Sequence, residues 1–188
     1  LDKSALGARY PTSKSMAERN REEWKDWFDE NASRLLLYAR QQTRTGIDAE
    51  DVLQDAFIRM WRTAEKEPEL GLPNLPFAFT SIRRCAIDLA RKNQRRQRRE
   101  EVAHAEKDDV QWFEYGLEDQ ERNAALEQAM KRLPEKYQEV LTLKIWGEQT
   151  FQAIADLHDI SINTVASRYR YALQGLRREL ESSPHLTS

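Results

Sequence analysis

The stretch that decides the fold is FQAIADLHDISINTVASRYRYAL, residues 151–173, which holds two helical patterns separated by a short turn. Apolar residues recur every three or four positions in both patterns, as on the buried face of an amphipathic helix. Thr150 and Ser161 precede the two patterns, and their hydroxyls can cap the first free amides of each helix. Asp159 falls in the turn, where Asp tolerates a left-handed backbone better than most residues do. The stretch therefore predicts a helix-turn-helix unit.

The second helix of this unit, expected at about residues 161–180, divides into two faces. Its apolar residues should turn toward the core: Ile162, Val165, Tyr169, Ala172, Leu176 and Leu180. The opposite face carries side chains that can bind base edges and phosphates in a major groove, namely Asn163, Thr164, Ser167, Arg168, Arg170 and Tyr171. The same face would also suit the solvated side of an ordinary amphipathic helix, so periodicity alone leaves both interpretations open.

Length and composition favour a highly charged helical protein. The chain has 188 residues, of which 33% are charged, with only six glycines and six prolines, so we expect one large domain or two small ones. No apolar run approaches the roughly 18 residues that span a bilayer, and we expect no signal peptide. The single Cys85 cannot form an internal disulfide, and no Cys/His set has zinc-ligand spacing. We expect a cytoplasmic protein with no metal and no cofactor.

The near-neutral net charge of −2 hides a strong separation of sign along the chain. Between residues 83 and 99 eight basic side chains face one acid, Asp88. Between residues 100 and 121 nine acidic side chains face one base, Lys107. The first run is suited to an anionic partner, although it would also serve as a solvated tail, and the second is typical of an acidic linker.

These patterns predict an all-α protein of two small helical domains joined by an acidic linker. We expect a disordered lead at 1–17, an N-terminal domain at 18–99, the linker at 100–120 and a C-terminal domain at 121–183. Helical spacing predicts one or two helices over 18–43, ended by Gly46, and others over 48–62 and 76–95. In the C-terminal domain it predicts helices at 124–133, 134–146, 151–157 and 161–180. In the linker, Val110, Trp112, Phe113 and Tyr115 offer apolar surface to bury.

A second motif, IDAEDVLQDAFIRMWR at residues 47–62, combines an apolar stripe with an acidic face. Asp48 is a suitable N-cap, and acids in the first turn complement the positive end of a helix. Val52, Phe57, Met60 and Trp61 form the stripe, and Asp51 and Asp55 lie off it. The acidic face that carries Asp51 and Asp55 is suited to a basic surface on a protein partner.

Three blocks together resemble the bacterial RNA polymerase sigma factors, specifically the extracytoplasmic-function (ECF) group of the sigma-70 family. They are DAEDVLQDAFIRMWR, FAFTSIRRCAIDLARKNQRR and LPEKYQEVLTLKIWGEQTFQAIADLHDISINTVASRYRYALQGLR, in that order. The resemblance covers residues 24–180, and it is specific because separated blocks match in order and spacing. It implies a protein that binds core polymerase and directs promoter recognition, DNA melting and transcription initiation.

The resemblance also implies partners and sites. The first block would dock on the clamp helices of the largest polymerase subunit through Asp51, Gln54, Asp55, Ile58 and Trp61, and the C-terminal domain would meet the flap of the second-largest. The second block would bind and melt the −10 element through Arg83, Arg84, Asp88, Arg91, Lys92, Arg95 and Arg96. The recognition-helix residues given above would read the −35 element. An anti-sigma factor is a further partner that the resemblance allows.

Within these blocks some positions have a structural interpretation or depart from the family. Phe77 and Phe79 are expected in the core rather than as platforms for unstacked bases. Ala166 and Tyr171 stand where basic residues are usual in the family, so the −35 sequence does not follow from the resemblance.

Two other classes of function compete with this prediction. A helix-turn-helix regulator that is not a polymerase subunit would need neither the arginine cluster nor the acidic docking helix. A helical adaptor that binds only proteins would not depend on Arg168 and Arg170. An enzyme is disfavoured, because His104, His158 and His185 are isolated and no phosphate-binding glycine loop occurs.

Overall fold

The computed structural model describes residues 16–100, 111–113 and 120–182. Every regular element in these ranges is a helix, which confirms the all-α prediction. None of these helices combines the length and the apolar character that crossing a membrane requires. The predicted lead at 1–17 falls almost entirely outside the described residues.

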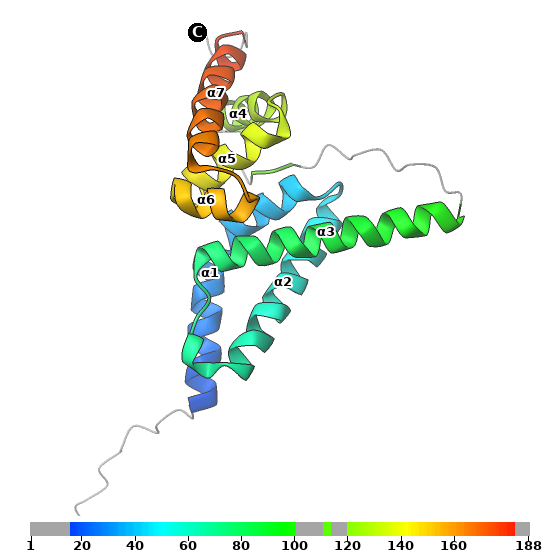
Figure 1. The fold of residues 1–188 in the computed structure, drawn as a ribbon, viewed down its shortest axis with the longest axis vertical. Helices are drawn as coiled ribbons and strands as arrows, with labels where there is room; N and C mark the ends of the chain where they lie inside the picture. Colours follow the sequence, from blue (N-terminus) through cyan, green and yellow to red (C-terminus); the bar gives the residue numbers. More distant parts are fainter. Residues whose placement is uncertain (1–15, 101–110, 114–119, 183–188) are drawn as a thin grey trace, which may run out of the picture.

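The N-terminal half consists of α1 (Met16–Gln42), α2 (Gly46–Lys66), a 3₁₀ turn η1 (Pro68–Leu70) and α3 (Leu75–Glu100). The predicted first helical region is one continuous helix. α2 packs against both α1 and α3, and α3 crosses the upper part of this group (Figure 1). Their buried faces form one core, which includes Trp24, Leu35, Tyr38, Val52, Met60, Phe79 and Ile82.

The start of α2 corrects two predictions. Thr45, not Asp48, is the N-cap: its hydroxyl accepts the amide of Asp48 at 3.0 Å. Gly46 begins α2 instead of ending the preceding helix. Both residue types are good caps, but Thr45 stands three positions earlier, which leaves the Asp48 carboxylate in the first turn beside the positive helix end.

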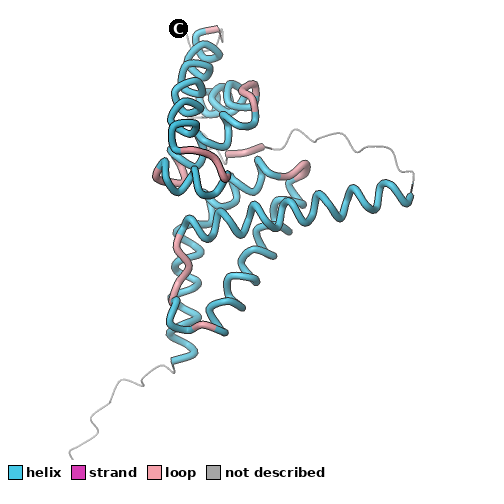
Figure 2. The backbone as a smooth tube through the Cα atoms, in the orientation of Figure 1, coloured by secondary structure: helices cyan, strands magenta, loops and turns pink. Residues whose placement is uncertain are grey.

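Helix α3 is longer than predicted. Its start is fixed by Asn74, whose side-chain oxygen accepts the amide of Phe77 at 2.9 Å, with Pro76 in the first turn as expected. The helix continues past Arg95 to Glu100, because arginine is a strong helix former and no Gly or Pro interrupts the run. Figure 2 shows α3 as one unbroken helix whose last turns extend beyond the neighbouring helices.

The C-terminal half consists of α4 (Gln120–Lys131), α5 (Glu135–Ile145), α6 (Phe151–His158) and α7 (Ile162–Glu181). The predicted caps are confirmed: the Thr150 hydroxyl accepts the amide of Ala153, and the Ser161 hydroxyl accepts that of Thr164, both at 3.1 Å. Asp159 adopts φ 53° and ψ 51°, the left-handed conformation expected in the turn. The helix-turn-helix prediction is therefore confirmed as a fold.

The described part of the linker is anchored on both halves. Trp112 is buried beside Leu37 of α1 and Met130 of α4. Its amide donates to the Glu127 carboxylate at 2.9 Å, and its carbonyl accepts from Arg40 at 3.0 Å. Trp112 thus supplies the burial predicted for the linker, whereas Val110 and Tyr115 lie outside the described residues.

The two halves pack against each other through an apolar junction. Leu35, Tyr38 and Phe79 of the N-terminal half share one core with residues of α5, α6 and α7, which include Val140, Leu143, Ile154, Ala155 and Val165. The two halves approach each other closely at Gly147, just after α5. A Cβ atom there would lie 2.7 Å from the carbonyl oxygen of Leu143 and 3.1 Å from Cζ of Phe79.

Polar contacts surround this apolar junction and centre on Glu139 of α5. One carboxylate oxygen accepts from Nε2 of Gln42 at 2.8 Å and from Nη1 of Arg83 at 3.2 Å. The other lies 3.5 Å from Nδ1 of His158. Three helices are therefore joined to α5 through one carboxylate.

Two further contacts cross the junction. Nε2 of Gln41 donates to the Thr142 hydroxyl at 2.6 Å. Arg34 pairs with Glu148 at 3.3 Å. Because Glu148 has a positive φ of 55°, the turn after α5 holds this carboxylate in a backbone conformation that non-glycine residues seldom adopt.

His158 is the titratable group enclosed by the junction, and its side chain is only 4% exposed. Burial lowers its pKa below the usual 6.5; Glu139 opposes this effect, while Arg83 and Arg168 add to it. Its Nε2 has no hydrogen-bond partner among the described residues. The imidazole is therefore neutral at physiological pH.

We predict that Gly147→Ala lowers the free energy of unfolding by about 1–3 kcal/mol, because the new methyl group overpacks the junction against backbone. Gly46→Ala is the matched control, since a Cβ at Gly46 meets nothing within 4 Å. It should leave stability unchanged or raise it by up to about 1 kcal/mol. Urea unfolding followed by circular dichroism measures both, and equal effects of the two variants would contradict the close approach.

We also predict that stability depends on the protonation of His158. Since its folded-state pKa lies below the unfolded value of 6.5, the stabilisation is complete above pH 6.5 and is lost as the pH falls below it. Urea unfolding between about pH 5 and 7.5 should give a slope of up to ~1.4 kcal/mol per pH unit from this group. His158→Gln should remove that contribution, and an unchanged slope in the variant would refute it.

Candidate functional site

The acidic face predicted on α2 is present and open to solvent. Asp51, Gln54, Asp55 and Ile58 are all exposed, and their spacing places them on one side of the helix. The opposite side of α2 is buried through Ala49, Val52, Leu53, Ala56 and Met60. α2 therefore presents two carboxylates, an amide and an apolar side chain to solvent.

Trp61 stands apart from the rest of this set. It is half-buried, and its ring packs edge-on against Trp24 at a centroid distance of 5.0 Å. Much of its surface is therefore used inside the N-terminal core, and only the remainder borders the acidic face.

Helix α3 exposes most of the predicted basic residues along one stripe. All five are exposed: Arg84, Arg91, Lys92, Arg95 and Arg96. Arg84, Arg91 and Arg95 are seven and four residues apart and share one face of the helix, and Lys92 and Arg96, each one position further on, flank that face. A cationic stripe of this kind attracts a phosphate backbone.

The remaining two members of the predicted −10 set have partners within the protein. Asp88, at the same face as the stripe, pairs with Arg59 of α2 at 3.1 Å, and this hydrogen bond raises the pKa of Arg59. Arg83 is turned away from the stripe toward Glu139. The structure thus brings five of the six predicted bases together and separates Arg83 from them.

The two phenylalanines at the start of α3 differ. Phe79 is fully buried, as predicted, and packs edge-on against Tyr38 at 5.3 Å. The prediction is wrong for Phe77, which is 38% exposed. Side chains two positions apart in a helix point in directions that differ by about 200° around its axis. Phe77 and Phe79 therefore lie on opposite faces of α3.

The N-terminal half of α7 carries the predicted recognition residues. Asn163, Arg170 and Tyr171 are exposed, whereas Thr164, Ser167 and Arg168 are half-buried. The division by helical phase is confirmed for Val165 and Ala172, which are buried, and for Tyr169, whose ring packs on Phe151 at 5.5 Å. It is wrong for Ile162, which is 44% exposed in the first turn of the helix.

Next to this surface lies an aromatic and basic cluster that the sequence analysis missed. The Tyr137 ring of α5 lies 6.4 Å from the Tyr171 ring, Lys136 lies over Tyr137, and Arg170 lies over Tyr171. The only sequence feature that could have indicated this cluster is the adjacent pair Lys136 and Tyr137 at the start of α5. Nothing in that pair indicates contact with a helix more than 30 residues later.

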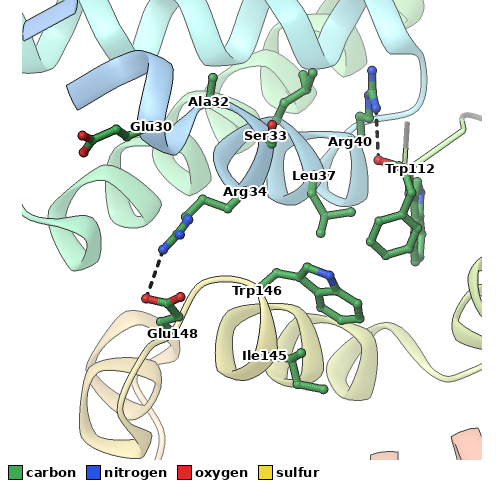
Figure 3. A pocket seen from close by; sticks show the side chains of 12 residues that line it. Glu30, Ala32, Ser33, Arg34, Leu37, Arg40, Trp112, Ile145, Trp146 and Glu148 are labelled. Carbon is green, nitrogen blue, oxygen red and sulfur yellow. Dashed lines mark hydrogen bonds and ion pairs between the residues drawn. The ribbon is translucent and has the colours of Figure 1, made fainter. Parts of the chain in front are cut away.

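A cavity of about 650 Å³ opens between α1, Trp112 and the end of α5. Figure 3 shows Leu37 and Trp146 facing each other across it, with the Arg34–Glu148 ion pair at one side. Within the described ranges no group of three His, Cys, Asp or Glu is placed to hold a metal ion. The cavity lies at the junction of the two halves, and its lining combines apolar side chains such as Leu37 and Trp146 with the charged side chains of Arg34 and Glu148.

The chain matches two family models. Residues 27–96 match "Sigma-70 region 2". The matched residues span most of α1, all of α2 and nearly all of α3. Residues 123–176 match "Sigma-70, region 4", which contains the helix-turn-helix.

Relatives agree with both matches. The chain is 31% identical to "ECF RNA polymerase sigma factor SigL" of Mycobacterium tuberculosis over 160 residues, covering 82% of this chain and 86% of that one. It is 28% identical to "RNA polymerase sigma-E factor" of Streptomyces avermitilis, covering 85% and 86%. Both comparisons extend across the two halves.

A solved structure has the same fold. The sigma factor RpoE of Bartonella quintana, crystallised with the anti-sigma factor NepR, aligns with a TM-score of 0.61 over 85% of this chain and 99% of that one. At 22% identity, this likeness concerns the fold alone. The two regional matches and the 31% identical relative, together with the arrangement of helices, show that the chain belongs to the sigma-70 family of RNA polymerase sigma factors, in its extracytoplasmic-function group.

Proposed function

We propose that this sigma factor binds core RNA polymerase through the acidic face of α2, and that it holds a promoter with the basic stripe of α3 and the recognition helix α7. The family supports polymerase binding and promoter recognition as the function. The observation that carries the assignment to residues is the presence, on one chain, of an exposed acidic face on α2, an exposed basic stripe on α3 and a partly exposed polar surface on α7. We further propose that the chain acts in the cytoplasm and is not an enzyme.

The α2 face suits a basic protein surface. Asp51 and Asp55 are one helical turn apart, and Arg59 of the same helix, whose charge also interacts with Asp55, is hydrogen-bonded to Asp88 of α3. Ile58, 38% exposed, adds apolar contact beside them. We assign the clamp helices of the largest polymerase subunit as the partner, with the flap of the second-largest meeting the C-terminal half.

The α3 stripe suits promoter opening. Its cations would hold the phosphate backbone while bases leave the duplex. Unstacking a base costs a few kcal/mol, and stacking on an aromatic ring returns about 1–3 kcal/mol. Phe77, exposed at the start of α3, is the aromatic side chain that we assign to this task.

The α7 surface suits a duplex. Asn163 and Arg170 would bind base edges or phosphates at the −35 element, with Thr164, Ser167 and Arg168 beside them. The neighbouring Lys136 and Tyr137 would extend this surface to the backbone of the same duplex.

An anti-sigma factor is proposed as a further partner, since the structurally similar RpoE was solved bound to one. The alternative of a helix-turn-helix regulator that acts without polymerase is not favoured, because it does not account for the match to region 2.

The first prediction concerns polymerase binding. Asp51→Lys combined with Asp55→Lys should weaken binding to core polymerase by about 10-fold or more, because the reversed charges would repel a basic partner. Glu65→Lys with Glu67→Lys is the control, since both acids are exposed, one in the last turn of the same helix and the other directly after it. Fluorescence anisotropy with labelled sigma factor measures the affinity. Equal losses in the two double variants would contradict the assigned face.

The second prediction concerns promoter binding by the assembled holoenzyme. Arg91→Gln with Lys92→Gln should weaken it and reduce the slope of log K against log salt by about 1.4–1.8, at roughly 0.7–0.9 per phosphate contact. Arg177→Gln with Arg178→Gln, exposed near the end of α7, should leave the slope unchanged. Filter binding from about 50 to 200 mM salt gives the slopes. A slope unaffected by the first pair would remove the α3 stripe from the DNA interface.

A further inference from the structure

An acidic residue stands in the middle of the basic stripe on α3. Asp88 follows Arg84 by four positions and precedes Arg91 by three, so the three side chains lie on one face of the helix. The Asp88 side chain is 53% exposed, and a negative charge at this place repels a phosphate backbone. DNA binding along this stretch is therefore favoured when a cation neutralises Asp88.

The cation that pairs with Asp88 comes from another helix. Nη1 of Arg59, on α2, donates a hydrogen bond to the Asp88 carboxylate at 3.1 Å. Arg84 and Lys92 are each four positions from Asp88, a spacing at which ion pairs form within a helix. In the part of the chain that the structure describes, however, Asp88 pairs with Arg59 and not with either of them. Both cations of α3 thus remain available to an outside anion.

The Arg59–Asp88 pair is poorly placed to stabilise the fold. Both side chains are about half exposed, and exposed ion pairs contribute little because water and salt screen them. The buried side chains that α2 and α3 contribute to the common core, among them Met60 and Ile82, pack without this pair. The pair is therefore better suited to setting the charge of the surface than to holding the two helices together.

We propose that Arg59 is a positioning residue for promoter binding: it neutralises Asp88, so that the cations of α3 bind phosphate instead of the acid beside them. This inference rests on the proposed role of the α3 stripe at the promoter. Asp88 here contacts Arg59 and not a base, unlike the direct DNA contact that the resemblance implies. Without Arg59, Asp88 would pair with Arg84 or Lys92, and the stripe would lose one cation.

The test measures promoter binding by holoenzyme, assembled with saturating core polymerase, in filter binding from about 50 to 200 mM salt. Arg59→Gln should weaken binding about 3- to 10-fold and reduce the slope of log K against log salt by about 0.7–0.9, the value of one phosphate contact. Arg177→Gln is the matched control, because it breaks another exposed ion pair, with Glu181 near the end of α7. Equal effects of the two variants would overturn the role of Arg59.

Asp88→Asn distinguishes neutralisation from direct contact with a base. Alone, it should leave the affinity unchanged or raise it by up to about 3-fold, because it removes a repulsive charge. Combined with Arg59→Gln, it should restore the affinity and the salt slope to near their original values, since no acid then remains to be neutralised. Weaker binding by Asp88→Asn alone, or a double variant as weak as Arg59→Gln, would refute the proposal.

Arg59→Lys tests whether the charge of Arg59 is what matters. It keeps a cation on α2 and should retain most of the affinity, whereas a loss equal to that of Arg59→Gln would contradict a role based on charge. Circular dichroism confirms that each variant is helical. Core binding by Arg59→Gln, followed by fluorescence anisotropy, should stay within about 2-fold, because the variant keeps the acidic face of α2. A loss confined to core binding would overturn the assignment of Arg59 to the promoter.

Failure of this inference and failure of the proposed function give different results. If Arg91→Gln with Lys92→Gln leaves the salt slope unchanged, the α3 stripe does not bind DNA, and the role of Arg59 is overturned with it. If that pair of substitutions reduces the slope while Arg59→Gln does not, the stripe stands and only the role of Arg59 is refuted.

Discussion

The insertion of Phe79 between Tyr38 and the end of α5 is the contact on which the arrangement of the whole molecule depends. Its ring is fully buried and meets the Tyr38 ring edge-on at 5.3 Å. Its Cζ atom would lie 3.1 Å from a Cβ atom at Gly147, where the Leu143 carbonyl oxygen, at 2.7 Å, leaves no room for a side chain. The Tyr38 phenol is enclosed with it, and burial raises its pKa so far that it stays neutral. One aromatic pair thus links α1, α3 and α5, and the positions of α6 and α7 follow from it.

The features that the sequence predicted well are local. The caps at Thr150 and Ser161 and the left-handed Asp159 depend on hydrogen bonds and backbone preferences within four residues, so the pattern contains all the necessary information. Two wrong predictions were also local. Two residues suited to an N-cap stand close together before α2, and Thr45 rather than Asp48 takes that position. Phe77 was predicted in the core with Phe79, although helical geometry places the two side chains on opposite faces. Periodicity established the element types and left the exact boundaries open.

The features that the sequence did not predict are contacts between distant residues. Arg83 meets Glu139 across 56 positions, and Tyr137 meets Tyr171 from another helix. No spacing rule relates such pairs, because they arise only when whole helices pack. The resemblance assigned Arg83 to the −10 set together with the adjacent Arg84. Adjacent residues of a helix point in different directions, however, so that Arg84 is exposed while Arg83 points into the junction and pairs with Glu139. The surfaces on α2 and α7 were predictable because exposure follows directly from an amphipathic pattern.

Arg83 combines a predicted contact with DNA and an observed packing contact with Glu139. An ion pair that is partly withdrawn from water contributes little net stability, because desolvation offsets most of the attraction, while loss of one partner leaves a poorly hydrated charge. The Arg83–Glu139 pair, with side chains 30% and 18% exposed, therefore sets the register of the two halves more than it stabilises them. The apolar contacts around Phe79 supply most of the attraction. Polar contacts thus fix the geometry of this junction, while the buried apolar side chains hold it together.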